Sequence, residues 1–152
     1  MPNPEEKLAE SRRLSGMLVR IAERSKMSFA DAVAPFGLPI HLARAMLLLH
    51  NPAPMRELAD HLACDRSYIT SLADQLEERG LVARTQGEDR RVKLLALTEA
   101  GQNLRDQISG AVAEQSLVMR KLTDAQRHAL APLLERLLDG DTDDDGVSPG
   151  AC

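Results

Sequence analysis

The side chains best suited to recognition chemistry are hydroxyls, an amide and arginines gathered between positions 65 and 91. Within this stretch apolar residues recur at helical spacing, which leaves the polar side chains on the other faces of the same helix. The apolar set is Ile69, Leu72, Ala73 and Leu76, and the polar set is Ser67, Tyr68, Thr70, Ser71 and Gln75. Such groups exchange hydrogen bonds with phosphates or base edges. Because no nucleophile is spaced with a base and no carboxylates are paired, we predict a binding protein and not an enzyme.

The ends of this helix carry their own signals. Asp65 fits an N-cap whose carboxylate accepts from the free amides of the first turn, and Gly80 fits the left-handed residue that closes the last turn. A shorter helical segment precedes it, so the two form a helix-turn-helix.

A charged hairpin is expected directly afterwards. Residues 81–86 and 92–97 are rich in Val, Leu and Thr and flank the turn-forming sequence from Gly87 to Arg91. A helix-turn-helix followed by such a hairpin is a winged helix, in which the second helix enters a major groove and the wing reaches a minor groove. The expected fold is therefore mainly α with a small β-hairpin wing, and its partner is double-stranded DNA.

At these residues the chain resembles the MarR family of bacterial transcriptional regulators. The matching features are Leu76-Glu77-x-x-Gly80-Leu81-Val82-x-Arg84, then Asp89-Arg90-Arg91, and Leu97-Thr98-x-x-Gly101. The resemblance covers about Glu5 to Asp139. It implies a winged helix-turn-helix between N- and C-terminal dimerisation helices, in a homodimer whose operator binding is tuned by a small molecule or by redox state.

Seven residues are the candidate DNA contacts: Arg66, Ser67, Tyr68, Thr70, Ser71, Arg90 and Arg91. Arg91 either enters a narrow minor groove or is a solvated hairpin tip, and Arg66 binds either a guanine or a phosphate. Asp89, beside two arginines, is expected to be an internal clamp and not a DNA contact, because a carboxylate would repel phosphates. Arg84 and Asp74 are expected to pair with each other or with neighbours, which would brace the wing against the helix.

Charge supports a local DNA footprint. The net charge is −4 over 152 residues, but five aspartates lie between positions 139 and 145, and the remaining chain carries +1. Five basic residues between Arg79 and Lys93 face only two acidic ones, so positive charge concentrates at the wing. Salt-sensitive binding is expected.

The chain divides into four expected segments: supporting and dimerisation helices over 5–50, the DNA-reading unit over 51–97, C-terminal dimerisation helices over 98–139 and an acidic, disordered tail over 140–152. The first segment should hold a helix from Glu5 to Arg24, a short helical turn around Phe29 to Phe36, and an apolar helix from Ile40 to Leu49. A long helix should follow Thr98 and continue to Met119.

A capping box at Thr123–Gln126 opens the last helix, which Pro132 should kink or restart. The leucines from Leu130 to Leu138 have more apolar surface than one small domain covers, so they and the first helix should meet a second subunit.

The family's ligand pocket lies between the dimerisation helices and the reading unit. The candidates here are Met17, Arg20, His41, Arg44 and Met46, which would suit a small anion or would otherwise be ordinary core and solvated charge. We expect no cofactor and no metal site, because only His61 and Cys64 of the possible ligands are closely spaced. No apolar run is long enough for a membrane span, so a cytoplasmic location is expected.

Together these features predict a homodimeric repressor that binds an inverted-repeat operator and is released by a small effector. Two alternatives remain. One is a winged-helix protein-interaction module without specific DNA binding, and the other is a redox- or metal-responsive regulator of the same fold.

Overall fold

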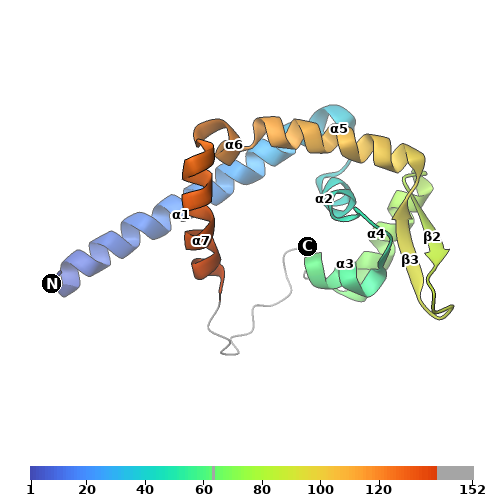
Figure 1. Ribbon diagram of the computed structural model, residues 1–152, viewed down its shortest axis with the longest axis horizontal. Helices are drawn as coiled ribbons and strands as arrows, with labels where there is room; N and C mark the ends of the chain where they lie inside the picture. Colours follow the sequence, from blue (N-terminus) through green and yellow to red (C-terminus); the bar gives the residue numbers. More distant parts are fainter. Residues whose placement is uncertain (63, 140–152) are drawn as a thin grey trace.

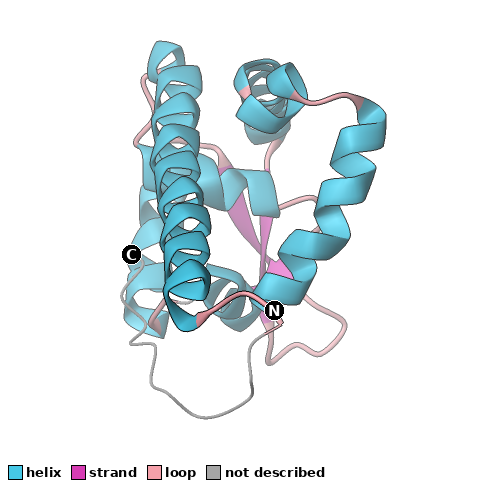
Figure 2. Ribbon diagram, turned by 90° about the vertical axis from the view of Figure 1, so that its left-hand side faces the viewer, coloured by secondary structure: helices cyan, strands magenta, loops and turns pink. Residues whose placement is uncertain are grey.

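The chain folds into helices with one small sheet (Figure 2). A computed structural model describes residues 1–62 and 64–139. The elements, in chain order, are α1 (Pro4–Val33), a 3-10 turn (Ala34–Phe36), α2 (Ile40–Leu48), β1 (Ala53–Pro54), α3 (Met55–Leu62), α4 (Arg66–Glu78), β2 (Val82–Gln86), β3 (Lys93–Leu97), α5 (Glu99–Gln115), α6 (Leu117–Lys121) and α7 (Asp124–Leu138). The predicted class, mainly α with a β-hairpin wing, is confirmed. Figure 1 shows the hairpin at one end of the molecule and the start of α1 at the other.

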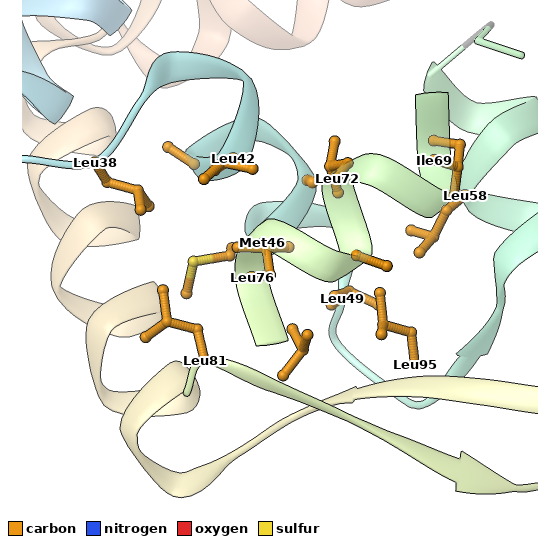
Figure 3. Packing of buried hydrophobic residues seen from close by; sticks show 14 of the residues in the cluster. Leu38, Leu42, Met46, Leu49, Leu58, Ile69, Leu72, Leu76, Leu81 and Leu95 are labelled. Carbon is orange, nitrogen blue, oxygen red and sulfur yellow. The ribbon is translucent and has the colours of Figure 1, made fainter. Parts of the chain in front are cut away.

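The core forms where α4 packs against α2, α3 and the sheet (Figure 3). The apolar face predicted for α4 is confirmed, because Ile69, Leu72, Ala73 and Leu76 are all buried. Leucines and a methionine from the neighbouring elements close around it: Leu42, Met46, Leu49, Leu58, Leu81 and Leu95. Burying an aliphatic side chain of this size contributes about 1.5–3 kcal/mol, so this cluster fixes how α4 is presented.

The two ends of α4 differ from each other. Gly80 has the predicted left-handed conformation, with φ of 71°. Asp65 occupies the N-cap position with an extended backbone, but its side chain makes no capping hydrogen bond. The prediction that its carboxylate caps the first turn is therefore wrong. That carboxylate is exposed, so water can solvate it, and the side chain leaves the first-turn amides of α4 uncapped.

The sheet has three antiparallel strands in the order β1-β3-β2. The predicted hairpin is present, with Val82 opposite Leu97 and Gln86 opposite Lys93. The additional strand β1 pairs Ala53 with Leu95 and Pro54 with Leu94. The sequence did not suggest a strand here, because two residues are too few to show an alternating pattern and one of them is proline. They pair with β3 only because tertiary packing brings them to it.

The start of α5 is joined to the turn that follows α4. The Thr98 amide donates to the Leu81 carbonyl at 3.0 Å, and the Thr98 hydroxyl donates to the Gly80 carbonyl at 2.6 Å. The same hydroxyl accepts from the Gly101 amide at 3.1 Å, which caps α5. A Cβ atom on Gly101 would lie 2.0 Å from the Leu81 carbonyl oxygen, so only glycine permits this approach.

Helix boundaries in the two terminal segments differ from expectation in three places. α1 is one helix of 30 residues, because residues 25–28 contain no Gly or Pro and the helix continues until Pro35 is near. α5 stops at Gln115, where the Ser28 hydroxyl of α1 donates to the terminal carbonyl at 2.5 Å. α7 begins at the predicted capping box and continues as one helix through Pro132, so the helix does not restart there.

The terminal helices leave large apolar side chains uncovered. On α1 these are Leu8, Leu14, Met17, Leu18, Val19, Ile21 and Met27, and on α7 they are Leu133, Leu134, Leu137 and Leu138. No residue of α7 is buried. In the part of the chain that the structure describes, no helix is long and apolar enough to span a bilayer.

Replacing Gly101 with Ala should destabilise the fold by about 1–3 kcal/mol, because the added methyl group overlaps a backbone oxygen that cannot move freely. Gly110 is the matched control, since it lies in the same helix with open space around its Cβ position. Gly110→Ala should stabilise by up to about 1 kcal/mol through helix propensity. Urea unfolding at one fixed protein concentration measures both, and equal stability of the two variants would contradict the close contact.

Candidate nucleic-acid interface

A cleft of about 480 Å³ separates α4 from the wing. The start of α3 and the first half of α4 form one side, and the beginning of β3 with its preceding turn forms the other. Its lining residues are Pro54, Met55, Arg56, Arg66, Ile69, Thr70, Arg91, Val92 and Lys93. A helix and a hairpin tip therefore face the same cleft, so one ligand can contact both of them.

The charge in this cleft has one sign. Arg56, Arg66, Arg91 and Lys93 line it, and no carboxylate does. Within residues 1–62 and 64–139, none of these four cations has an ion-pair partner. Like charges held at one site repel each other, and a polyanion placed between them relieves that repulsion.

The structure brings only some of the predicted DNA contacts together. Arg66, Thr70 and Arg91 line the cleft, and the Thr70 hydroxyl donates to the Arg66 carbonyl at 3.0 Å. Ser67 and Ser71 are exposed on α4 outside the cleft lining, with the Gln75 amide donating to the Ser71 hydroxyl at 3.4 Å.

Two other predicted contacts lie elsewhere. Arg90 is exposed at the hairpin tip but does not line the cleft, and Tyr68 turns toward α2. Arg56 and Lys93 line the cleft although sequence reasoning did not select them. The basic run of the wing could have indicated Lys93. No sequence pattern could have indicated Arg56, because only the tertiary fold brings it to the cleft.

Ion pairs on the outside of the wing hold it against α4. The Arg84 guanidinium on β2 donates to Asp74 at 2.5 Å and to Glu77 at 3.0 Å. The predicted Arg84–Asp74 pair is confirmed, and the hydrogen bond to Asp74 is the largest cause of the raised pKa of Arg84. The basic residue that braces the wing is therefore separate from those that face the cleft.

The hairpin tip is held by its own backbone. The Asp89 carboxylate accepts from the Arg91 amide at 3.0 Å, and the Val92 amide donates to the Asp89 carbonyl at 2.9 Å. Asp89 is thus an internal clamp, as expected, and it holds the backbone amide of Arg91 because its short side chain reaches the backbone two residues on. The Arg91 guanidinium is consequently left to face the cleft.

A second cavity, of about 310 Å³, lies between α2 and the start of α4. Its lining residues are His41, Arg44, His61, Leu62, Cys64, Tyr68 and Leu72, without a carboxylate. The rings of His41 and Tyr68 lie 6.4 Å apart, and the Arg44 guanidinium lies 5.6 Å from the Phe29 ring centre. His61 Nδ1 donates to the Glu57 carbonyl at 2.8 Å, because that oxygen can only accept.

The five predicted effector residues do not all meet at this cavity. His41 and Arg44 line it, whereas Met46 is fully buried in the core. Met17 and Arg20 are exposed on α1 and lie outside the lining. Among the residues that the structure describes, no three His, Cys, Asp or Glu side chains are grouped to hold a metal ion.

Comparison with known proteins gives a consistent result. The profile of the MarR family matches residues 45–93. A MarR-family transcriptional regulator of Rhodococcus sp. RHA1 is 30% identical, with a TM-score of 0.68 over 84% of this chain and 93% of that one. CouR of Rhodococcus jostii RHA1, solved bound to p-coumaroyl-CoA, is 27% identical, with a TM-score of 0.69 over 86% and 95%.

A curated relative adds a third match. A putative transcriptional regulatory protein for the hcr operon of Thauera aromatica is 36% identical over 100 residues, which are 64% of this chain. The matched region spans 60% of the length of that relative.

Proposed function

The chain belongs to the MarR family of transcriptional regulators, and on that premise we propose that it is a homodimeric repressor of an inverted-repeat operator, released by a small anion. Members of this family regulate transcription and are not enzymes. The single observation that carries the DNA-binding proposal is the cleft in which Arg56, Arg66, Arg91 and Lys93 converge without a carboxylate.

The cleft supports a division of contacts between two grooves. The N-terminal turns of α4 enter the major groove, where Arg66 and the hydroxyls of Ser67, Thr70 and Ser71 meet phosphates and base edges. The uncapped amides at the start of α4 suit a phosphate, because a helix N-terminus carries partial positive charge. Arg91 extends from the wing into the adjacent minor groove, which A·T-rich sequence narrows and makes more negative.

The uncovered terminal helices support dimerisation. Leu8, Leu14 and Leu18 on α1 and the leucines near the end of α7 are exposed in one subunit. Because large exposed apolar surfaces on soluble proteins mark interaction sites, a second copy of the chain is the proposed cover for these side chains. Twofold symmetry then presents two α4 helices to one side of the duplex.

The second cavity is the proposed effector site. Arg44, His41 and the Tyr68 hydroxyl offer hydrogen-bond donors beside the apolar Leu62 and Leu72, a combination that suits an aromatic or aliphatic carboxylate or its thioester. The p-coumaroyl-CoA found in the Rhodococcus jostii relative supports an anion with an apolar part. Tyr68 belongs to α4, so a ligand that moves its ring alters how α4 meets DNA.

Replacing Arg91 with Ala should weaken operator binding by about 1–3 kcal/mol, because it removes a minor-groove contact from an exposed tip. Arg90→Ala is the matched control, since Arg90 is adjacent in sequence but does not line the cleft. Fluorescence anisotropy with operator DNA at physiological salt measures both. Equal losses would mean that general charge decides binding, and unchanged affinity of Arg91→Ala would remove that residue from the interface.

Replacing Arg44 with Gln should weaken binding of an aromatic carboxylate such as benzoate or p-coumarate by about tenfold or more, because a charge-assisted hydrogen bond is lost. Arg20→Gln removes the same charge from α1, outside the cavity, and should leave that affinity unchanged. Isothermal titration of the free protein tests this without DNA. If Arg20→Gln shows the loss and Arg44→Gln does not, the effector site lies along α1 instead.

A further inference from the structure

The two side chains with which α2 lines the second cavity each contact an aromatic ring from another helix. His41 and Arg44 are three residues apart on α2, so they lie on one face of it. The His41 ring lies 6.4 Å from the Tyr68 ring of α4. The Arg44 guanidinium lies over the Phe29 ring of α1, 5.6 Å from its centre. The chain has only three Phe, Tyr or Trp residues, so two of the three contact this pair.

The Phe29 ring has a defined place, whereas Arg44 has few other contacts. Phe29 is half-buried and packs against the core. The hydroxyl of the preceding Ser28 donates to the Gln115 carbonyl at 2.5 Å, which joins this turn of α1 to the end of α5. Arg44 is exposed, and within residues 1–62 and 64–139 it makes no ion pair. The ring contact therefore restricts where the guanidinium lies.

A cation held in this way is suited to binding a carboxylate. The negative face of an aromatic ring attracts the guanidinium. The ring contacts one face of the guanidinium, and the N–H groups lie in the guanidinium plane, so they stay free to donate to a ligand. A long side chain loses conformational freedom when it binds, so a side chain that is already held binds more tightly.

We propose that Phe29 is a positioning residue for the effector: its ring holds the Arg44 guanidinium at the wall of the second cavity, where Arg44 receives the carboxylate of the ligand. This inference rests on the proposed effector site and adds to it a residue that does not line the cavity. Because Phe29 acts through the charge of Arg44, its ring should matter for a carboxylate and not for a neutral ligand of the same shape.

The first test is isothermal titration of the full-length protein with benzoate and with its neutral isostere benzamide. Phe29→Leu removes the ring face but keeps an apolar side chain, and it should weaken benzoate binding about 2–5-fold without changing benzamide binding. Phe29→Tyr keeps the ring face and should bind benzoate like the unmodified protein. Phe36→Leu is the matched control, since Phe36 is also half-buried against the core, and it should leave both affinities unchanged.

A double-mutant comparison separates positioning from packing. On an Arg44→Gln background, Phe29→Leu should cause no further loss of benzoate affinity, because the group that it positions is gone. If Phe29→Leu weakens benzoate and benzamide alike, or if Phe36→Leu gives the same loss, the ring acts through packing and the inference is wrong. If Arg44→Gln alone leaves benzoate affinity unchanged, or if the unmodified protein binds neither ligand, the proposed effector site is wrong and the inference fails with it.

The second test needs no ligand. Protons over an aromatic face are shifted upfield, so the Arg44 side-chain Hε signal should lie upfield in the unmodified protein and in Phe36→Leu. In Phe29→Leu it should return to the usual arginine position, and its loss in Arg44→Gln assigns it. An unshifted signal in the unmodified protein would overturn the proposal. If the shift is present, but Arg44→Gln weakens benzoate binding and Phe29→Leu does not, the effector site stands and the positioning role is wrong.

Discussion

The close approach of α5 to the turn after α4 is the constraint on which the reading unit depends. Gly101 lies against the Leu81 carbonyl, and the Thr98 hydroxyl bridges the Gly80 carbonyl and the Gly101 amide. These contacts join the end of α4, the start of β2, the end of β3 and the start of α5 at one point. α5 also packs against α1. The same junction therefore fixes the position of the DNA-reading surface relative to the helices proposed to dimerise.

Basic residues are divided between two tasks. Arg84 is satisfied by Asp74 and Glu77, so it fixes the wing against α4 without adding free positive charge. Arg56, Arg66, Arg91 and Lys93 have no such partners among the described residues and face one cleft. Exposed ion pairs contribute little to stability, about 0–1 kcal/mol each, so the bracing pair serves mainly to set geometry. The net charge of the chain is negative, so net charge alone does not indicate this local positive surface.

Local patterns predicted the parts of the structure that depend on local interactions. The apolar spacing of α4, the left-handed Gly80, the hairpin and the Thr123 capping box all follow from a few neighbouring residues. The third strand β1 and the place of Arg56 in the cleft depend on contacts between distant segments, which no local pattern contains. For the same reason the sequence named five effector residues, of which only His41 and Arg44 line the cavity.

We propose that a twofold dimer reads DNA with both copies of α4 at once. Two recognition helices on one face of a duplex require half-sites about 10 base pairs, or roughly 34 Å, apart. The most direct measurement is footprinting on an operator beside the same site lengthened between its halves by about five base pairs, half a helical turn. A rigid twofold dimer should protect the first DNA symmetrically and should lose most of its specific affinity for the second. Undiminished protection of the lengthened site would contradict it.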